Sequence, residues 1–184
     1  MNRYFNLIIC FSALILFSCN SGGETEQKQS SEPSTQGTGQ SGVKDETSTP
    51  NIVQVAVGSK DHTTLVAAVQ AAGLVDALSN AGPFTVFAPT NAAFDKLPAG
   101  TVDGLLKPEK LEDLKGILEY HTYVGSLKTE YMQDGQSYEQ VNGGKIKITK
   151  QGEKTMVNDK ATIIASIPTA NGIIHVIDEV LLPQ

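Results

Sequence analysis

The chain has 184 residues, two cysteines and a formal net charge of −6, and 40% of its residues are hydrophobic. This length accommodates one ordinary domain plus accessory segments. Because Arg3 is the only arginine and the rest of the chain is mildly acidic, the sequence lacks the basic stripe that nucleic-acid binding demands, which excludes nucleic acid as a partner. Cys10 and Cys19 both lie near the N-terminus, so the remaining chain has no cysteine for a disulfide or a metal site.

Residues 1–18 are predicted to be a lipoprotein signal peptide. An apolar run from Phe5 to Phe17 covers only about 20 Å as a helix, short of the ~30 Å core of a bilayer. The run ends in Leu-Phe-Ser-Cys19, which resembles a bacterial lipobox, and this resemblance implies an acylated Cys19 that partners membrane lipid. The alternative is an ordinary signal peptide with a coincidental cysteine. Asn20 favours an outer membrane, and the choice between its periplasmic and surface faces stays open.

Residues 19–50 are expected to form a tether behind the lipidated cysteine. Between residues 20 and 50 the sequence is rich in Ser, Thr, Gly, Gln and Glu, and Val43 is its only aliphatic residue. Such a segment cannot bury enough apolar surface to offset the entropy of ordering, so we expect it to be disordered. Its r.m.s. span is then about 30 Å.

The ordered domain is expected to span residues 51–184 and to begin with helices. Asp61 or Thr63 can cap a helix whose apolar face recurs at helical spacing, and Gly73 suits the position after its end. Short helical turns are expected over residues 74–78 and 101–106. Pro108 favours the start of a longer helix that runs to about Tyr120.

Residues 82–98 combine a turn, a strand and a helix start. Gly82-Pro83 turns the chain, and Phe84 to Phe87 has the aromatic and β-branched composition of a strand. Thr90 or Asn91 can then cap a helix.

The second half of the domain changes to strand periodicity. After a brief helix expected over residues 127–132, Asn142-Gly143 between two alternating segments is a strong hairpin signal. Further strands are expected around residues 155–157, 162–165 and 173–182. Helices first and meandering strands later predict an α+β domain.

Three motifs of this domain resemble those of the fasciclin (FAS1) family. They are the stretch from Gly82 to Pro98, the Tyr120-His121 pair and the terminal segment from Asn171 to Pro183. The resemblance covers about residues 51–184. It implies the FAS1 fold, a β-sandwich or wedge of antiparallel strands with several helices packed on one side.

His121 is the residue that this resemblance singles out. In the family its counterpart commonly bonds to a polar residue of the first motif, which implies a neutral structural hydrogen bond between Asn91 and His121. The resemblance also indicates a partner-binding surface around the Tyr-His pair. Its expected members are Leu118, Tyr120, His121 and Val124.

The sequence contains no catalytic constellation and no cofactor motif. The three histidines lack metal-ligand spacing, so no metal site and no cofactor is expected. We expect His175 to be partly buried and structural, and His62 to be solvated. No nucleophile elbow or phosphate-binding glycine loop is present, so we do not expect an enzyme.

These observations lead to three functional hypotheses. The first is a lipid-anchored envelope module that mediates adhesion by binding a protein or a polysaccharide. The second is a structural or regulatory protein that faces the periplasm and pairs with another membrane protein. The third is binding or hydrolysis of a small ligand in the crevice between helices and sheet.

Overall fold

The computed structural model describes residues 48–183. The predicted signal peptide, Cys19 and nearly all of the tether lie outside these residues. The first half of the domain is helical apart from one strand. Its elements are α1 (Ile52–Gly58), η2 (Lys60–His62), α2 (Thr63–Ala71), α3 (Val75–Ser79), β1 (Phe84–Pro89), α4 (Asn91–Asp95), α5 (Thr101–Leu105), η3 (Pro108–Lys110) and α6 (Leu111–Tyr120).

The second half consists mainly of strands. Its elements are β2 (Thr122–Val124), η4 (Thr129–Tyr131), β3 (Ser137–Glu139), β4 (Lys145–Gln151), β5 (Lys154–Val157), β6 (Ala161–Thr169) and β7 (Gly172–Ile177). The predicted order of helices and strands is therefore confirmed, and the Asn142-Gly143 hairpin joins β3 to β4. The helix predicted from Pro108 begins with the tighter turn η3, and α6 starts at Leu111.

Two helix starts have the caps that the sequence favours. The Asn51 side chain accepts from Gln54 N while the Gln54 side chain accepts from Asn51 N, which makes a complete capping box for α1. At α4 the Thr90 hydroxyl accepts from Ala93 N at 3.2 Å, so Thr90 rather than Asn91 is the cap.

The seven strands form one mixed sheet in the order β2-β1-β7-β6-β5-β4-β3. The α+β class is confirmed, but one central pair departs from the antiparallel expectation, because β1 and β7 run parallel with Val86 opposite Ile174. At the far ends the sheet curls back on itself, since Val141 N donates to the Thr122 carbonyl at 2.9 Å.

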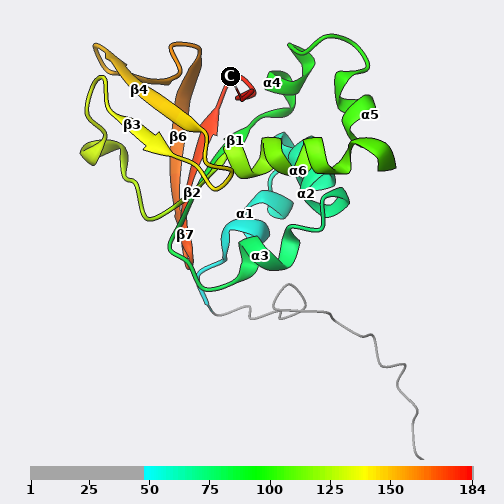
Figure 1. Ribbon diagram of the computed structural model, residues 1–184. Helices are drawn as coiled ribbons and strands as arrows, with labels where there is room; N and C mark the ends of the chain where they lie inside the picture. The colour runs from blue at the N-terminus through cyan, green and yellow to red at the C-terminus, as the bar shows by residue number, and fades with distance from the viewer. Residues whose placement is uncertain (1–47, 184) are drawn as a thin grey trace, which may run out of the picture. The chain divides into compact units, whose positions relative to one another are not determined.

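Strands β1 and β7 carry core residues on both faces, as expected of a buried parallel pair. Figure 1 shows the labelled helices gathered on one side of these strands. The helix-side core contains Ile52, Leu65, Ala68, Val69, Val86, Ala88, Leu114, Leu118, Ile174 and Val176. The core on the other face contains Phe87, Tyr120, Leu127, Met132, Ile146, Ile148, Val157, Ala161, Ile177 and Leu181. Both cores lie within the expected domain of residues 51–184.

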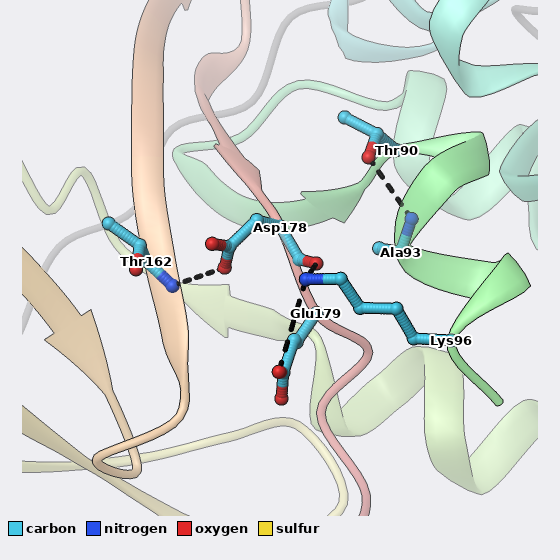
Figure 2. Close-up of polar contacts among 6 residues, drawn as sticks. All are labelled: Thr90, Ala93, Lys96, Thr162, Asp178 and Glu179. Atoms are coloured by element: carbon cyan, nitrogen blue, oxygen red, sulfur yellow. Dashed lines mark hydrogen bonds and ion pairs between the residues drawn. The ribbon is translucent and has the colours of Figure 1, made fainter.

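Polar contacts fix the segment that follows β7. Figure 2 shows the Asp178 carboxylate accepting from Thr162 N on β6, at 2.6 Å, while the Lys96 ammonium donates to the Asp178 carbonyl at 2.8 Å. Lys96 also lies 4.0 Å from the Glu179 carboxylate. The segment is therefore held between the sheet and the end of α4.

Asn171, at the opposite end of β7, likewise holds neighbouring segments in place through hydrogen bonds. Its side-chain oxygen Oδ1 accepts from Ile52 N at 2.9 Å, and its side-chain amide Nδ2 donates to the backbone carbonyls of Leu78 and Asn80 at 2.8 and 2.9 Å. One buried side chain thus positions α1 and the end of α3 over the sheet.

Candidate functional site

Tyr120, predicted to contact a partner, is buried in the core on the sheet's far face. Only 2% of it is exposed. Its hydroxyl donates to the Lys145 carbonyl at 2.8 Å and accepts from the Asn158 amide at 3.0 Å. The hydroxyl therefore both donates and accepts a hydrogen bond within the domain. Tyr120 fastens the end of α6 to β4 and to the turn after β5.

His121 is also buried, with 3% of its surface exposed. Leu181 N donates to His121 Nε2 at 3.0 Å, so Nδ1 carries the ring proton and donates to the Ile117 carbonyl at 2.8 Å. Burial lowers the pKa of His121 to about 4, against the smaller opposing effect of the Ile117 carbonyl. The histidine is neutral at neutral pH, as expected for a structural bond.

The predicted hydrogen bond between Asn91 and His121 is wrong. The side-chain oxygen of Asn91 accepts from Thr64 N at 3.0 Å and from the Thr63 hydroxyl at 3.2 Å. Its side-chain amide donates to the Lys60 carbonyl at 3.0 Å. Asn91 lies at the start of α4, where it faces the beginning of α2. There it bonds groups that the helix start leaves unpaired.

The predicted partner-binding set is mostly internal. Leu118 belongs to the helix-side core and is 6% exposed, whereas Val124 at the end of β2 is 64% exposed. Direct contact between a partner and Leu118, Tyr120 or His121 is therefore incompatible with the fold. Val124 alone of the four is available at the surface.

The other two histidines are buried as well. His175 is fully buried, and its Nε2–H donates to the Leu127 carbonyl at 2.7 Å, so Nδ1 accepts from the Ser166 hydroxyl at 2.8 Å. His62, expected to be solvated, is only 6% exposed, because η2 turns its ring inward and Ser59 bonds Nδ1 at 2.8 Å. Desolvation lowers the pKa of both rings.

Val124 is exposed on β2, whereas its neighbour Tyr123 points to the other side of the sheet and packs, like Tyr138, against the core there. On β2 and β3 the rings of Tyr123 and Tyr138 meet edge to face, with centroids 5.7 Å apart. Val141 is 47% exposed and its backbone bonds to β2 at Thr122. We call the exposed Val124 and Val141, together with the half-buried Tyr123 and Tyr138, the β2–β3 edge. Sequence reasoning missed three of its members because only the closure of the sheet brings β2 and β3 together.

A cavity of about 310 Å³ lies on the helix side of the sheet, under α1, α2 and α3. Its walls are aliphatic side chains of those helices and of β1 and β7. A second cavity of about 360 Å³ lies beside the segment after β7 and is lined in part by Lys96, Lys160 and Glu179. The third hypothesis, a small-ligand site between helices and sheet, thus has a physical space to occupy.

Two features are absent from the described residues, 48–183. In that part of the chain, no three His, Cys, Asp or Glu side chains come together in a way that suits a metal ion. Within the same range, no helix has both the length and the apolar character needed to cross a bilayer.

Comparison with known proteins identifies the family. A model of the fasciclin domain matches residues 60–183, and this chain therefore belongs to the fasciclin domain family. In the solved structure of a FAS1 domain pair from the insect cell adhesion molecule fasciclin I, the match covers 72% of this chain and 51% of that chain, with a TM-score of 0.65 and 18% identity. At that identity the likeness shows the fold alone. Both findings confirm the resemblance read from the three motifs.

Bacterial relatives resemble the chain more closely in sequence. Protein sll1483 of Synechocystis sp. is 48% identical over 132 residues, which are 72% of this chain and 73% of that protein. The cell surface glycolipoprotein MPB83 of Mycobacterium bovis is 42% identical over 110 residues, which are 60% of this chain and 48% of that protein. The family thus includes relatives named for a place on the cell surface.

Proposed function

We propose that this protein is a lipid-anchored module of the cell envelope that mediates adhesion by binding a protein or polysaccharide partner. The observation that carries the proposal is the β2–β3 edge. Val124 is 64% exposed and Val141 is 47% exposed there, with the half-buried rings of Tyr123 and Tyr138 on the adjoining strands, although the domain has two hydrophobic cores in which to bury such residues. Tyrosine combines a large apolar ring with a hydrogen-bonding tip, which suits it to interfaces.

The Tyr138 hydroxyl adds no charge to this contact. Tyr138 donates to the Gln136 side chain at 2.8 Å, and desolvation together with Tyr123 raises the pKa of Tyr138, so its hydroxyl stays protonated at neutral pH. An apolar patch of this kind can contact the apolar face of a sugar ring or an apolar side chain.

The envelope location rests on a separate argument. The lipobox-like sequence that ends at Cys19 and the polar tether behind it would hold the domain close to a membrane. The name of MPB83, a cell surface glycolipoprotein, supports this assignment by analogy. An outer membrane is our proposal for the anchoring site.

Binding by the isolated domain tests the adhesive role. Residues 51–184 are immobilised and presented with envelope polysaccharides, matrix proteins and whole cells. We expect Val124→Asp to weaken binding about tenfold, because it places a charge in an apolar contact. Ile164→Asp is the matched control, since Ile164 is a similarly exposed aliphatic residue, at 60%, on β6. Absence of binding to every surface would contradict the proposal.

Protease treatment of intact cells separates this role from the alternative of a periplasm-facing protein that pairs with another membrane protein. A domain that adheres outside the cell is cleaved. A protected domain, released only after the outer membrane is permeabilised, would favour the alternative.

A further inference from the structure

The cavity under α1, α2 and α3 has mostly aliphatic walls and opens to solvent at one side. Its floor is formed by the sheet residues Val86, Ala88 and Ile174, and its roof includes Ile52, Val66 and Val69. The volume of about 310 Å³ lies within the range of small-molecule sites. Apolar cavities of about 150 Å³ already stay dry and accept small apolar molecules.

The polar groups on the floor need no partner from outside. The His121 ring uses both nitrogens, one toward Ile117 and the other toward Leu181. The hydroxyl of Thr122 donates to the Leu118 carbonyl at 3.0 Å. The buried part of the cavity therefore offers a ligand only hydrocarbon contact, and a polar group placed there would lose its hydrogen bonds to water.

The mouth of the cavity has a different character. Gln54 and Gln70 line the cavity and are exposed, and Val57 beside them is 59% exposed. No Lys, Arg, Asp or Glu side chain lines any part of it. The cavity is thus apolar inside and polar but uncharged at its mouth. A matching ligand has a hydrocarbon tail that fills the interior and a small polar head that stays in water at the mouth.

We propose that this cavity binds a free single-chain amphiphile, such as a fatty acid, taken up from the aqueous phase. The lipid expected on Cys19 is a poor candidate, because a chain already buried in a bilayer gains nothing from moving to another apolar environment. A free amphiphile does gain, since each methylene transferred from water to the cavity strengthens binding about fourfold. This site lies on the other side of the sheet from the Tyr120 core. It is independent of the β2–β3 edge proposed for adhesion.

Fluorescence titration of residues 51–184 with dansyl-undecanoic acid tests the proposal. Competition with octanoic, decanoic and dodecanoic acids, each below its micelle concentration, then measures the contribution of tail length. We expect saturable binding, with affinity rising about fifteenfold for each pair of added methylenes until the cavity is full.

Neighbouring residues on α2 supply a matched pair of variants. Val66→Phe fills the cavity, whereas Ala67→Phe adds the same ring to the exposed face of the helix. Val66→Phe should weaken probe binding about tenfold, and Ala67→Phe should leave it unchanged. Ala56→Phe on α1 repeats the test in case Val66→Phe unfolds, which circular dichroism detects.

Three results would overturn the proposal. The first is the absence of saturable binding up to about 100 µM probe, a concentration well above the Kd of a ligand that buries such a tail. The second is equal binding by folded cavity-filling variants and by Ala67→Phe. The third is an affinity that does not change with tail length. None of these results bears on adhesion, which the Val124→Asp variant tests separately.

Discussion

Leu181 donates its backbone N–H to Nε2 of His121 at 3.0 Å, across 60 residues of sequence. This bond fixes the neutral tautomer, whose Nδ1–H donates to the Ile117 carbonyl. The ring therefore connects the end of α6 to the segment after β7. The histidine of the Tyr-His motif is an internal connector, and the surface available to a partner lies beyond it on β2.

This arrangement makes stability depend on pH. The unfolded chain protonates His121 near pH 6.5, whereas burial lowers the pKa of His121 in the folded protein to about 4. Between these values the unfolded state binds more protons, so the free energy of unfolding falls as the pH falls. We expect this residue to account for a loss of about 3 kcal/mol between pH 7 and pH 4. His62 and His175, whose pKa values are also lowered, act in the same direction.

Urea unfolding at a series of pH values measures the effect. His121→Gln removes the titrating group, so the variant should be less stable at pH 7 yet lose about 3 kcal/mol less than the wild type on acidification. Parallel stability curves for the two proteins would show that His121 is not the source of the pH dependence.

Tyr120→Phe separates a structural tyrosine from one that contacts a partner. The change removes the hydroxyl bonded to Lys145 and Asn158, and we expect it to lower the free energy of unfolding by about 1–2 kcal/mol. Binding per folded molecule should stay the same, because the ring is 2% exposed. Weaker binding at unchanged stability would place Tyr120 at the interface after all.

Two glycine substitutions should have opposite signs. A Cβ at Gly172 would lie 1.9 Å from the Phe84 carbonyl oxygen, where β1 and β7 approach each other, so Gly172→Ala should destabilise the domain by about 3 kcal/mol or more. A Cβ at Gly116 in α6 meets nothing within 4 Å, so Gly116→Ala should stabilise by about 0.5–1 kcal/mol. Thermal unfolding of both variants tests this difference. Similar melting temperatures for the two would contradict the close pairing of β1 and β7.

Local signals predicted much of this fold. Thr90 caps α4, and Asn142-Gly143 turns the β3–β4 hairpin, because a cap and a tight turn depend on residues close together in sequence. The parallel pairing of β1 with β7 has no such signal, since the two strands are far apart in the chain.

The candidate sites were harder to predict for the same reason. Tyr120 and His121 are polar residues at the end of a helix, and only their distant partners Lys145 and Leu181 explain why they are buried. The cavity depends on how α1 sits over the sheet, and that position is set by Asn171, more than a hundred residues away. No periodicity or motif encodes a volume formed in this way.

Retention of cells on a surface under flow tests whether the protein is a lipid-anchored adhesive module. Strains are compared that carry the wild-type protein, Cys19→Ala, Val124→Asp or Ile164→Asp, at equal protein levels. We expect Cys19→Ala and Val124→Asp cells to detach while Ile164→Asp cells remain attached like the wild type. Wild-type retention by both the Cys19→Ala and the Val124→Asp strains would contradict an anchored module that adheres through the β2–β3 edge.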